Sequence, residues 1–216
     1  MAIESKNPAL HAALLAGFAL VAALLLSSGN MATKGPIAER KHEDLVRSLA
    51  MVIPDEYHDN DLVKDLTMAA DAKGEWRMIH RARKNGKVTA IAFERIEHGY
   101  GEIHLVMGIN ARGHILGVRV LEHTETPGLG DKIEVKKDPW ILGFDGLWLG
   151  NPTASKWRVK KDGGVFDQFS GATITPRAVV RSVREGLEFF RLNKKDILAG
   201  RNMIDPRANA AKEQGS

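Results

Sequence analysis

Between Trp76 and His123, short apolar stretches alternate with glycine-containing breaks. The stretches are 76–83, 88–95, 102–109 and 115–123. Their β-branched and alternating apolar residues are typical of strands. The breaks at Asn85-Gly86 and at residues 110–113 are strong tight-turn signals, and tight turns join antiparallel neighbours. The pattern therefore predicts an antiparallel meander.

Helical periodicity flanks these strands on both sides. Residues 37–53 place Leu45, Leu49 and Val52 on one apolar stripe, which predicts an amphipathic helix that ends before Pro54. Asp61 or Asp65 is expected to lead into another short helical piece. A second long helix is expected from Pro176 to about Leu192, because Val180, Val183, Leu187 and Phe190 recur at spacings of three and four. Helices beside an antiparallel sheet predict an α+β fold.

An almost unbroken apolar run extends from Ala9 to Leu26, interrupted only by His11. Its length of about 18 residues meets the lower limit for a membrane-spanning helix. The small residues Ser27 to Gly29 would also allow cleavage as a signal peptide. We prefer an uncleaved transmembrane anchor, because the run exceeds the usual core of a signal peptide.

The composition excludes several kinds of site. The 216 residues include no cysteine, so this chain alone holds no disulfide, thiolate zinc site or iron–sulfur cluster. The formal net charge of +4 comes without a nucleic-acid-binding motif, so we expect no nucleic-acid partner. His98, His104, His114 and His123 form no tight ligand pair, and we expect no metal site.

A hydroxyl-rich stretch, Ser170-Gly171-Ala172-Thr173-Ile174-Thr175, directly precedes the second predicted helix. Thr175 stands where an N-cap is expected, and Pro176 stands at the first helical position. A helix start of this kind favours phosphate, because its N–H groups and dipole face the anion. The same residues could instead do no more than cap the helix.

A breaker-rich loop, residues 125–131, is the second unusual stretch. Its glycines allow close backbone approach, which suits a lip over a flat ring, although a plain connection would also explain it. Glu125 has the chemistry of a general base. No partner nucleophile stands at a telling spacing in the sequence, so we expect no catalytic residue and no complete active site in this chain alone.

The hydroxyl-rich stretch resembles the S-G-A-T-x-T signature of the FMN-binding domain in Rnf-type and sodium-translocating NADH:quinone reductase complexes. In that family the last threonine carries FMN through a phosphoester, which implies covalent FMN on Thr175. The loop at 125–131 resembles the family's other hallmark. The resemblance implies that these further residues lie at the flavin: Ser170, Gly171, Ala172, Thr173, Glu125, Thr126, Gly128 and Leu129.

The resemblance is greatest to the G subunit of the Rnf complex. It implies an electron-relay subunit in a membrane complex that couples electron transfer between NADH and ferredoxin to ion translocation. The implied partners are the membrane, iron–sulfur and flavin subunits of that complex, and a flavin transferase for maturation. The alternatives are the C subunit of the sodium-translocating quinone reductase and a non-redox, membrane-anchored binding or assembly module.

The expected organisation has five segments. They are a short cytoplasmic N-terminus (1–8), a transmembrane anchor (9–28), a connecting amphipathic helix (29–54), an FMN-binding domain (55–200) and a polar tail (201–216). Lys6 before the anchor and Lys34, Arg40 and Lys41 after it favour a cytoplasmic domain by charge counting. The resemblance instead implies the inner membrane with the FMN-binding domain in the periplasm, and we adopt that orientation.

Overall fold

The computed structural model describes residues 8–203, with the side chains of 8–10, 28–38, 41 and 42 left out. The N-terminal residues 1–7 and the predicted tail from residue 204 onward lie outside the described part. The chain forms two compact units, residues 1–44 and 45–216, and each is described by itself.

The first unit consists of most of α1 (Pro8–Ala50). The sequence predicted an apolar helix and a separate amphipathic helix, but α1 is continuous through both. Helix propagation is cooperative, so isolated weak helix formers between two long favourable runs need not end a helix. Among the described residues, no helix combines the length and apolar content that crossing a membrane requires.

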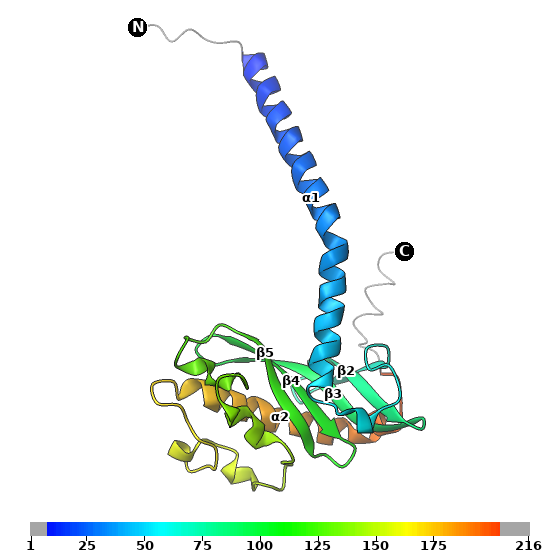
Figure 1. Cartoon of the computed structure of the whole chain (residues 1–216), viewed down its shortest axis with the longest axis vertical. Coiled ribbons are helices and arrows are strands. Elements are labelled where there is room, and N and C mark those ends of the chain that lie inside the picture. Colours follow the sequence, from blue (N-terminus) through cyan, green and yellow to red (C-terminus); the bar gives the residue numbers. More distant parts are fainter. Residues whose placement is uncertain (1–7, 204–216) are drawn as a thin grey trace. The chain divides into compact units, whose positions relative to one another are not determined.

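The second unit is built on a five-stranded antiparallel sheet in the order β1-β2-β3-β4-β5 (Figure 1). The strands are β1 (Leu66–Ala70), β2 (Trp76–Lys84), β3 (Lys87–His98), β4 (Glu102–Asn110) and β5 (Ile115–His123). The predicted meander is confirmed. The expectation of a helical piece after Asp61 or Asp65 is wrong, because residues 66–70 pair with β2 as an edge strand. Five residues are too few to reveal their strand period without that neighbour.

One face of the sheet is covered by α2 (Ile174–Leu198) (Figure 1). Phe189 of α2 packs on Phe93 of β3 with ring centroids 4.9 Å apart. Arg95 of β3 is buried beneath the helix, where its guanidinium donates to the Ser182 hydroxyl at 3.0 Å and to the Glu185 carboxylate at 2.7 Å. These apolar and charge-assisted contacts fix the position of α2, including its N-terminus, on the sheet.

The opposite face of the sheet receives the end of α1 and the residues after it. Leu49, Val52 and Ile53 are buried there in a small cluster with four sheet residues, Ala82, Ala90, Ala92 and Val106. Small side chains on β2 and β3 allow the chain to approach closely. The sheet is therefore packed on both faces, as the α+β prediction requires.

A long irregular segment joins β5 to α2. It carries four short 3₁₀ helices, η2 (Gly130–Ile133), η3 (Pro139–Phe144), η4 (Ala154–Lys156) and η5 (Lys160–Asp162), and a further one, η1 (Asp55–Tyr57), lies before the sheet. Phe144 stacks on Phe166 with centroids 4.8 Å apart, and Trp157 lies 5.3 Å from Phe166. These aromatic contacts join the middle of the segment, and the two unusual stretches of the sequence lie at its ends.

Candidate functional site

Thr175 is the second residue of α2 and is 1% exposed. The sequence predicted that Thr175 would be the N-cap and Pro176 the first helical residue, and this is wrong by two positions. The cap position belongs to Thr173, whose side chain makes no capping hydrogen bond. Pro176 is tolerated as the third residue because the first turn of a helix lacks internal acceptors for its N–H groups. Thr175 is thus turned inward, not toward the helix end.

The Thr175 hydroxyl donates a hydrogen bond of 2.5 Å to Oε2 of Glu125. Glu125 is 5% exposed, and its Oε1 accepts backbone N–H bonds of 2.9 Å from Tyr100 and Gly101. The spacing of the sequence indicated no partner for Glu125, and the structure pairs it with the Thr175 hydroxyl. The partner is 50 residues away in the sequence, a separation that no local spacing could reveal.

Gly130 lies beside this pair. A Cβ atom at this position would lie 2.7 Å from Oε2 of Glu125 and 2.8 Å from Oγ1 of Thr175. Gly171, with φ +81°, lies in the turn before α2, and a Cβ there would lie 3.4 Å from Cδ2 of Leu129. The two glycines keep the loops in contact and leave the threonine hydroxyl unobstructed by side chains of their own.

Thr175 opens onto a hollow of ≈ 290 Å³. Its lining comes from three segments of the chain: Tyr100, Glu125, Thr126, Leu129, Gly130, Gly171, Ala172, Thr173, Ile174 and Thr175. Tyr100 is 80% exposed and Ile174 is 54% exposed, so large apolar surfaces stand at the mouth of a polar, glycine-lined floor. Such a mixture suits a ligand with a planar ring and an anionic end.

Most of the predicted site residues meet in this hollow, with two exceptions. Ser170 lines a neighbouring pocket, and Gly128 lines neither of the two. The prediction missed Tyr100, Gly130 and Ile174. Gly130 and Ile174 lie inside the two motifs, so their place in the sequence could have indicated them. Tyr100 comes from the β3–β4 turn, and only the pairing of the strands brings it to the site.

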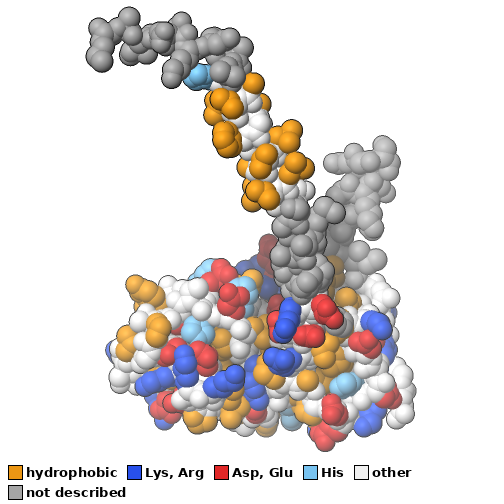
Figure 2. Space-filling model, turned by 45° about the horizontal axis from the view of Figure 1, so that its top comes forward, with side chains coloured by type: hydrophobic (Ala, Val, Ile, Leu, Met, Phe, Trp, Pro, Cys, Tyr) orange, Lys and Arg blue, Asp and Glu red, His pale blue; other side chains and the backbone are white. Residues whose placement is uncertain are grey.

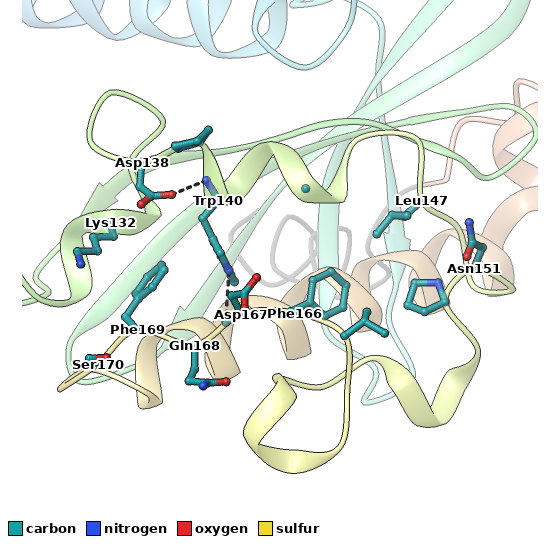
Figure 3. A pocket seen from close by; sticks show the side chains of 14 residues that line it. Lys132, Asp138, Trp140, Leu147, Asn151, Phe166, Asp167, Gln168, Phe169 and Ser170 are labelled. Carbon is teal, nitrogen blue, oxygen red and sulfur yellow. Dashed lines mark hydrogen bonds between the residues drawn. The ribbon is translucent and has the colours of Figure 1, made fainter.

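The neighbouring pocket, ≈ 910 Å³, has Ser170 in its lining together with Trp140, Asp167 and Phe169 (Figure 3). The Trp140 side chain extends across it, donating from Nε1 to the Asp167 carbonyl at 2.9 Å, while the Trp140 backbone N–H is held by Asp138 at 2.9 Å. Trp140 also makes an edge contact with Phe169, with centroids 5.2 Å apart. These contacts brace the chain that leads into the hydroxyl-rich stretch.

Charged residues around the site are paired within the chain. Arg177 contacts Asp162 at 2.6 Å and Arg181 contacts Glu97 at 2.8 Å. The hydrogen bond from Arg177 holds the pKa of Asp162 below its ordinary value. In the loop that follows Gly130, the hydrogen bond from Lys137 likewise lowers the pKa of Asp131. Arg177 and Arg181 of α2 are thus engaged with carboxylates of this chain.

Comparison with known proteins assigns the chain to a family. The FMN-binding domain family matches residues 99–188, which contain both loops of the hollow. The G subunit of an ion-translocating oxidoreductase complex from Cereibacter sphaeroides is 50% identical over 90% of this chain and 89% of its own. Proteins of the same name from Vibrio cholerae and Shewanella amazonensis are each 44% identical. Both matches cover 85% of this chain, and they cover 90% and 88% of those two proteins, respectively. The chain belongs to the family of Rnf G subunits.

This membership confirms the first of the two resemblances, to the G subunit of the Rnf complex. A solved structure of the C subunit of the sodium-translocating NADH–quinone reductase from Parabacteroides distasonis is 20% identical, with a TM-score of 0.41, over 67% of this chain and 70% of that one. Within this Rnf chain, the matched FMN-binding domain extends from the β3–β4 turn to α2. It leaves out β1, β2 and β3, which supply the rest of the sheet that supports the hollow.

Proposed function

We propose that this chain is the electron-relay subunit of an Rnf-type complex and carries FMN through a phosphoester on Thr175. The observation that carries the proposal is the convergence of both family motifs on one hollow, with Thr175 in its lining. The relatives are subunits of an ion-translocating oxidoreductase complex. When bound, FMN supplies one-electron transfer, and the protein fixes its position and surroundings.

The residues present fit the phosphate end of such a cofactor. The first turn of α2 provides N–H groups without internal acceptors and the positive end of a 25-residue helix, both of which favour an anion. Gly130 and Gly171 leave open the space that side chains would fill. The small side chains of Thr173 and Ala172 complete the lining close to Thr175.

The ring end of the cofactor fits the mouth of the hollow. Leu129 is 42% exposed there, beside the more exposed Tyr100 and Ile174. Apolar and aromatic surfaces of this kind contact a flat aromatic ring favourably. In this arrangement Glu125 and Thr126 would belong to the loop beside the ring, Gly128 would allow that loop to turn, and Ser170 would orient the chain that enters the α2 start.

We further propose that α1 anchors the chain in the inner membrane, with the FMN domain in the periplasm and the other members of the complex as partners. The apolar run at residues 9–26 supports this. Leu15, Phe18 and Leu26 are each more than 70% exposed in the first unit, and Figure 2 shows hydrophobic side chains along this part of α1. Coupling to ion translocation would be a property of the assembled complex.

Covalent attachment is tested by intact mass after co-expression with a flavin transferase. The wild-type chain should gain the mass of one FMN, and Thr175→Val should gain none, because it loses the hydroxyl but little volume. Thr173→Val is the matched control and should keep the flavin. An adduct on Thr173 or Ser170 would overturn the assignment, and no adduct on any residue would favour a non-redox binding module.

The orientation is tested by a reporter fused after Gly200. An alkaline phosphatase fusion should be active, since that enzyme matures only after export. A silent phosphatase together with a fluorescent cytoplasmic reporter at the same position would place the domain on the opposite side of the membrane, as the lysine and arginine count favours.

A further inference from the structure

Glu125 and Thr175 have the geometry of a base and the nucleophile that it activates. Both residues are buried, and Oγ1 of Thr175 donates directly to Oε2 of Glu125. A threonine hydroxyl is a weak nucleophile until a neighbouring base takes its proton. Both residues belong to the lining of the hollow, although Thr175 is only 1% exposed.

The two oxygens of Glu125 have separate tasks. Oε1 is fixed by the N–H groups of Tyr100 and Gly101, which leaves Oε2 directed at Thr175. Gly99 and Gly130 enclose the carboxylate, because a Cβ at Gly99 would lie 2.6 Å from Oε1 and one at Gly130 would lie 2.7 Å from Oε2. A carboxylate held this firmly is preorganised to accept a proton from one particular direction.

We propose that Glu125 is the general base of the chain's own flavinylation, and that the acceptor protein thereby contributes a catalytic group to its maturation. This rests on the proposed attachment of FMN to Thr175. It goes further by making Glu125 part of the reaction and not only of the binding loop. The maturation enzyme then has to deliver and activate the donor, while the acceptor activates its own hydroxyl.

The step balances with a flavin dinucleotide as the donor, in which a phosphoanhydride joins the FMN phosphate to a second nucleotide. The O–H bond of Thr175 breaks, and its proton passes to Oε2 of Glu125. A bond forms from Oγ1 to the phosphorus of the FMN phosphoryl group. The anhydride bond to that phosphorus breaks, and the nucleoside monophosphate leaves with the electron pair. Nothing is oxidised or reduced.

The test measures the attachment rate by intact mass with purified full-length chain, transferase and flavin dinucleotide, across a range of pH. Glu125→Gln keeps the size of the side chain and an oxygen for the N–H groups of Tyr100 and Gly101, but it removes the base. We expect its rate to fall by about 10²-fold or more, the usual contribution of a general base, with a melting temperature close to wild type. Glu102→Gln is the control, because this nearby carboxylate is half-exposed and contacts His104 instead.

The pH profile separates a base from a structural support. If a base takes the Thr175 proton, the ratio of the wild-type rate to the Glu125→Gln rate should fall toward acid pH, whereas a structural role should give a constant ratio. Equal rates in wild type and Glu125→Gln, or a constant ratio, overturn the proposal. If Glu125→Gln does not fold, Glu125→Asp decides: a wild-type rate at every pH overturns the proposal, and a loss of about 10-fold or more with an unchanged melting temperature supports it. A wild-type chain that takes up no flavin overturns the proposed function itself.

Discussion

A missing side chain at Gly130 is as important to the site as the side chains that are present. The hydrogen atom of this glycine faces the Glu125–Thr175 pair at a distance that no Cβ atom could occupy without a shift. Gly128, two residues earlier, differs in kind. Its φ of +78° demands a left-handed backbone, but a Cβ there would meet nothing within 4 Å. Glycine at position 130 therefore leaves the Glu125–Thr175 pair in place, whereas glycine at position 128 only allows the backbone to turn.

Gly130→Ala should impair flavin attachment more than it impairs folding, because its methyl group displaces Oε2 of Glu125 or Oγ1 of Thr175. Gly128→Ala should lower the free energy of unfolding by about 1–2 kcal/mol through backbone strain while leaving attachment intact. Intact mass and urea unfolding of both variants check this pair. Full attachment in Gly130→Ala, or loss of attachment in Gly128→Ala at equal folding, would contradict it.

At the scale of elements, two glycines let the chain after α1 lie directly on the sheet. Gly108 of β4 and Gly117 of β5 are cross-strand partners. A Cβ at Gly108 would lie 2.0 Å from the carbonyl oxygen of Val52, which is backbone and cannot turn aside. At Gly117 the closest approach would be 3.3 Å, to Met51 and Val52. The close approach of residues 51–52 to the sheet therefore depends mainly on the glycine of β4.

Gly108→Ala should lower the free energy of unfolding by about 1–3 kcal/mol, the usual cost of overpacking, because either Val52 or β4 must move. Gly117→Ala is the matched control, and its smaller clash should cost less. Urea unfolding followed by circular dichroism measures both. Equal losses in the two variants would show that the segment yields easily and is not fixed on the sheet.

At the scale of the whole molecule, the division into two units places the end of α1 with the domain. Leu45 begins the second unit, and Leu49, Val52 and Ile53 are at most 1% exposed within it. The C-terminal part of the predicted connecting helix at 29–54 therefore packs within the second unit. Its last turns belong to the core.

A fragment of residues 45–216 should unfold cooperatively, whereas a fragment that begins at Pro54 should be less stable by several kcal/mol. The shorter fragment loses three buried apolar side chains, each contributing about 1.5–3 kcal/mol, and exposes the small cluster on β2 and β3. Urea midpoints and binding of a hydrophobic dye compare the two. Identical midpoints would show that residues 45–53 add nothing to the domain.

The sequence by itself determined the meander and the existence of α2. Strand alternation, tight-turn residues and helical periodicity are local signals, and each acts within a few residues. The two family motifs also identified most of the positions that line the hollow, since their residue types are specific. Local signals were weaker at β1, whose five residues show their period only beside β2, and at the start of α2, where the cap was predicted two residues late.

Only the tertiary structure decided how the motifs work together. Glu125 and Thr175 are 50 residues apart, and their hydrogen bond exists because the sheet places the β5 end and the start of α2 at one point. Tyr100 and Gly101 reach the same carboxylate through the pairing of β3 with β4. No local pattern encodes such a meeting. It follows from burying the apolar face of α2 on the sheet, which fixes where the helix begins and therefore which hydroxyl faces the base.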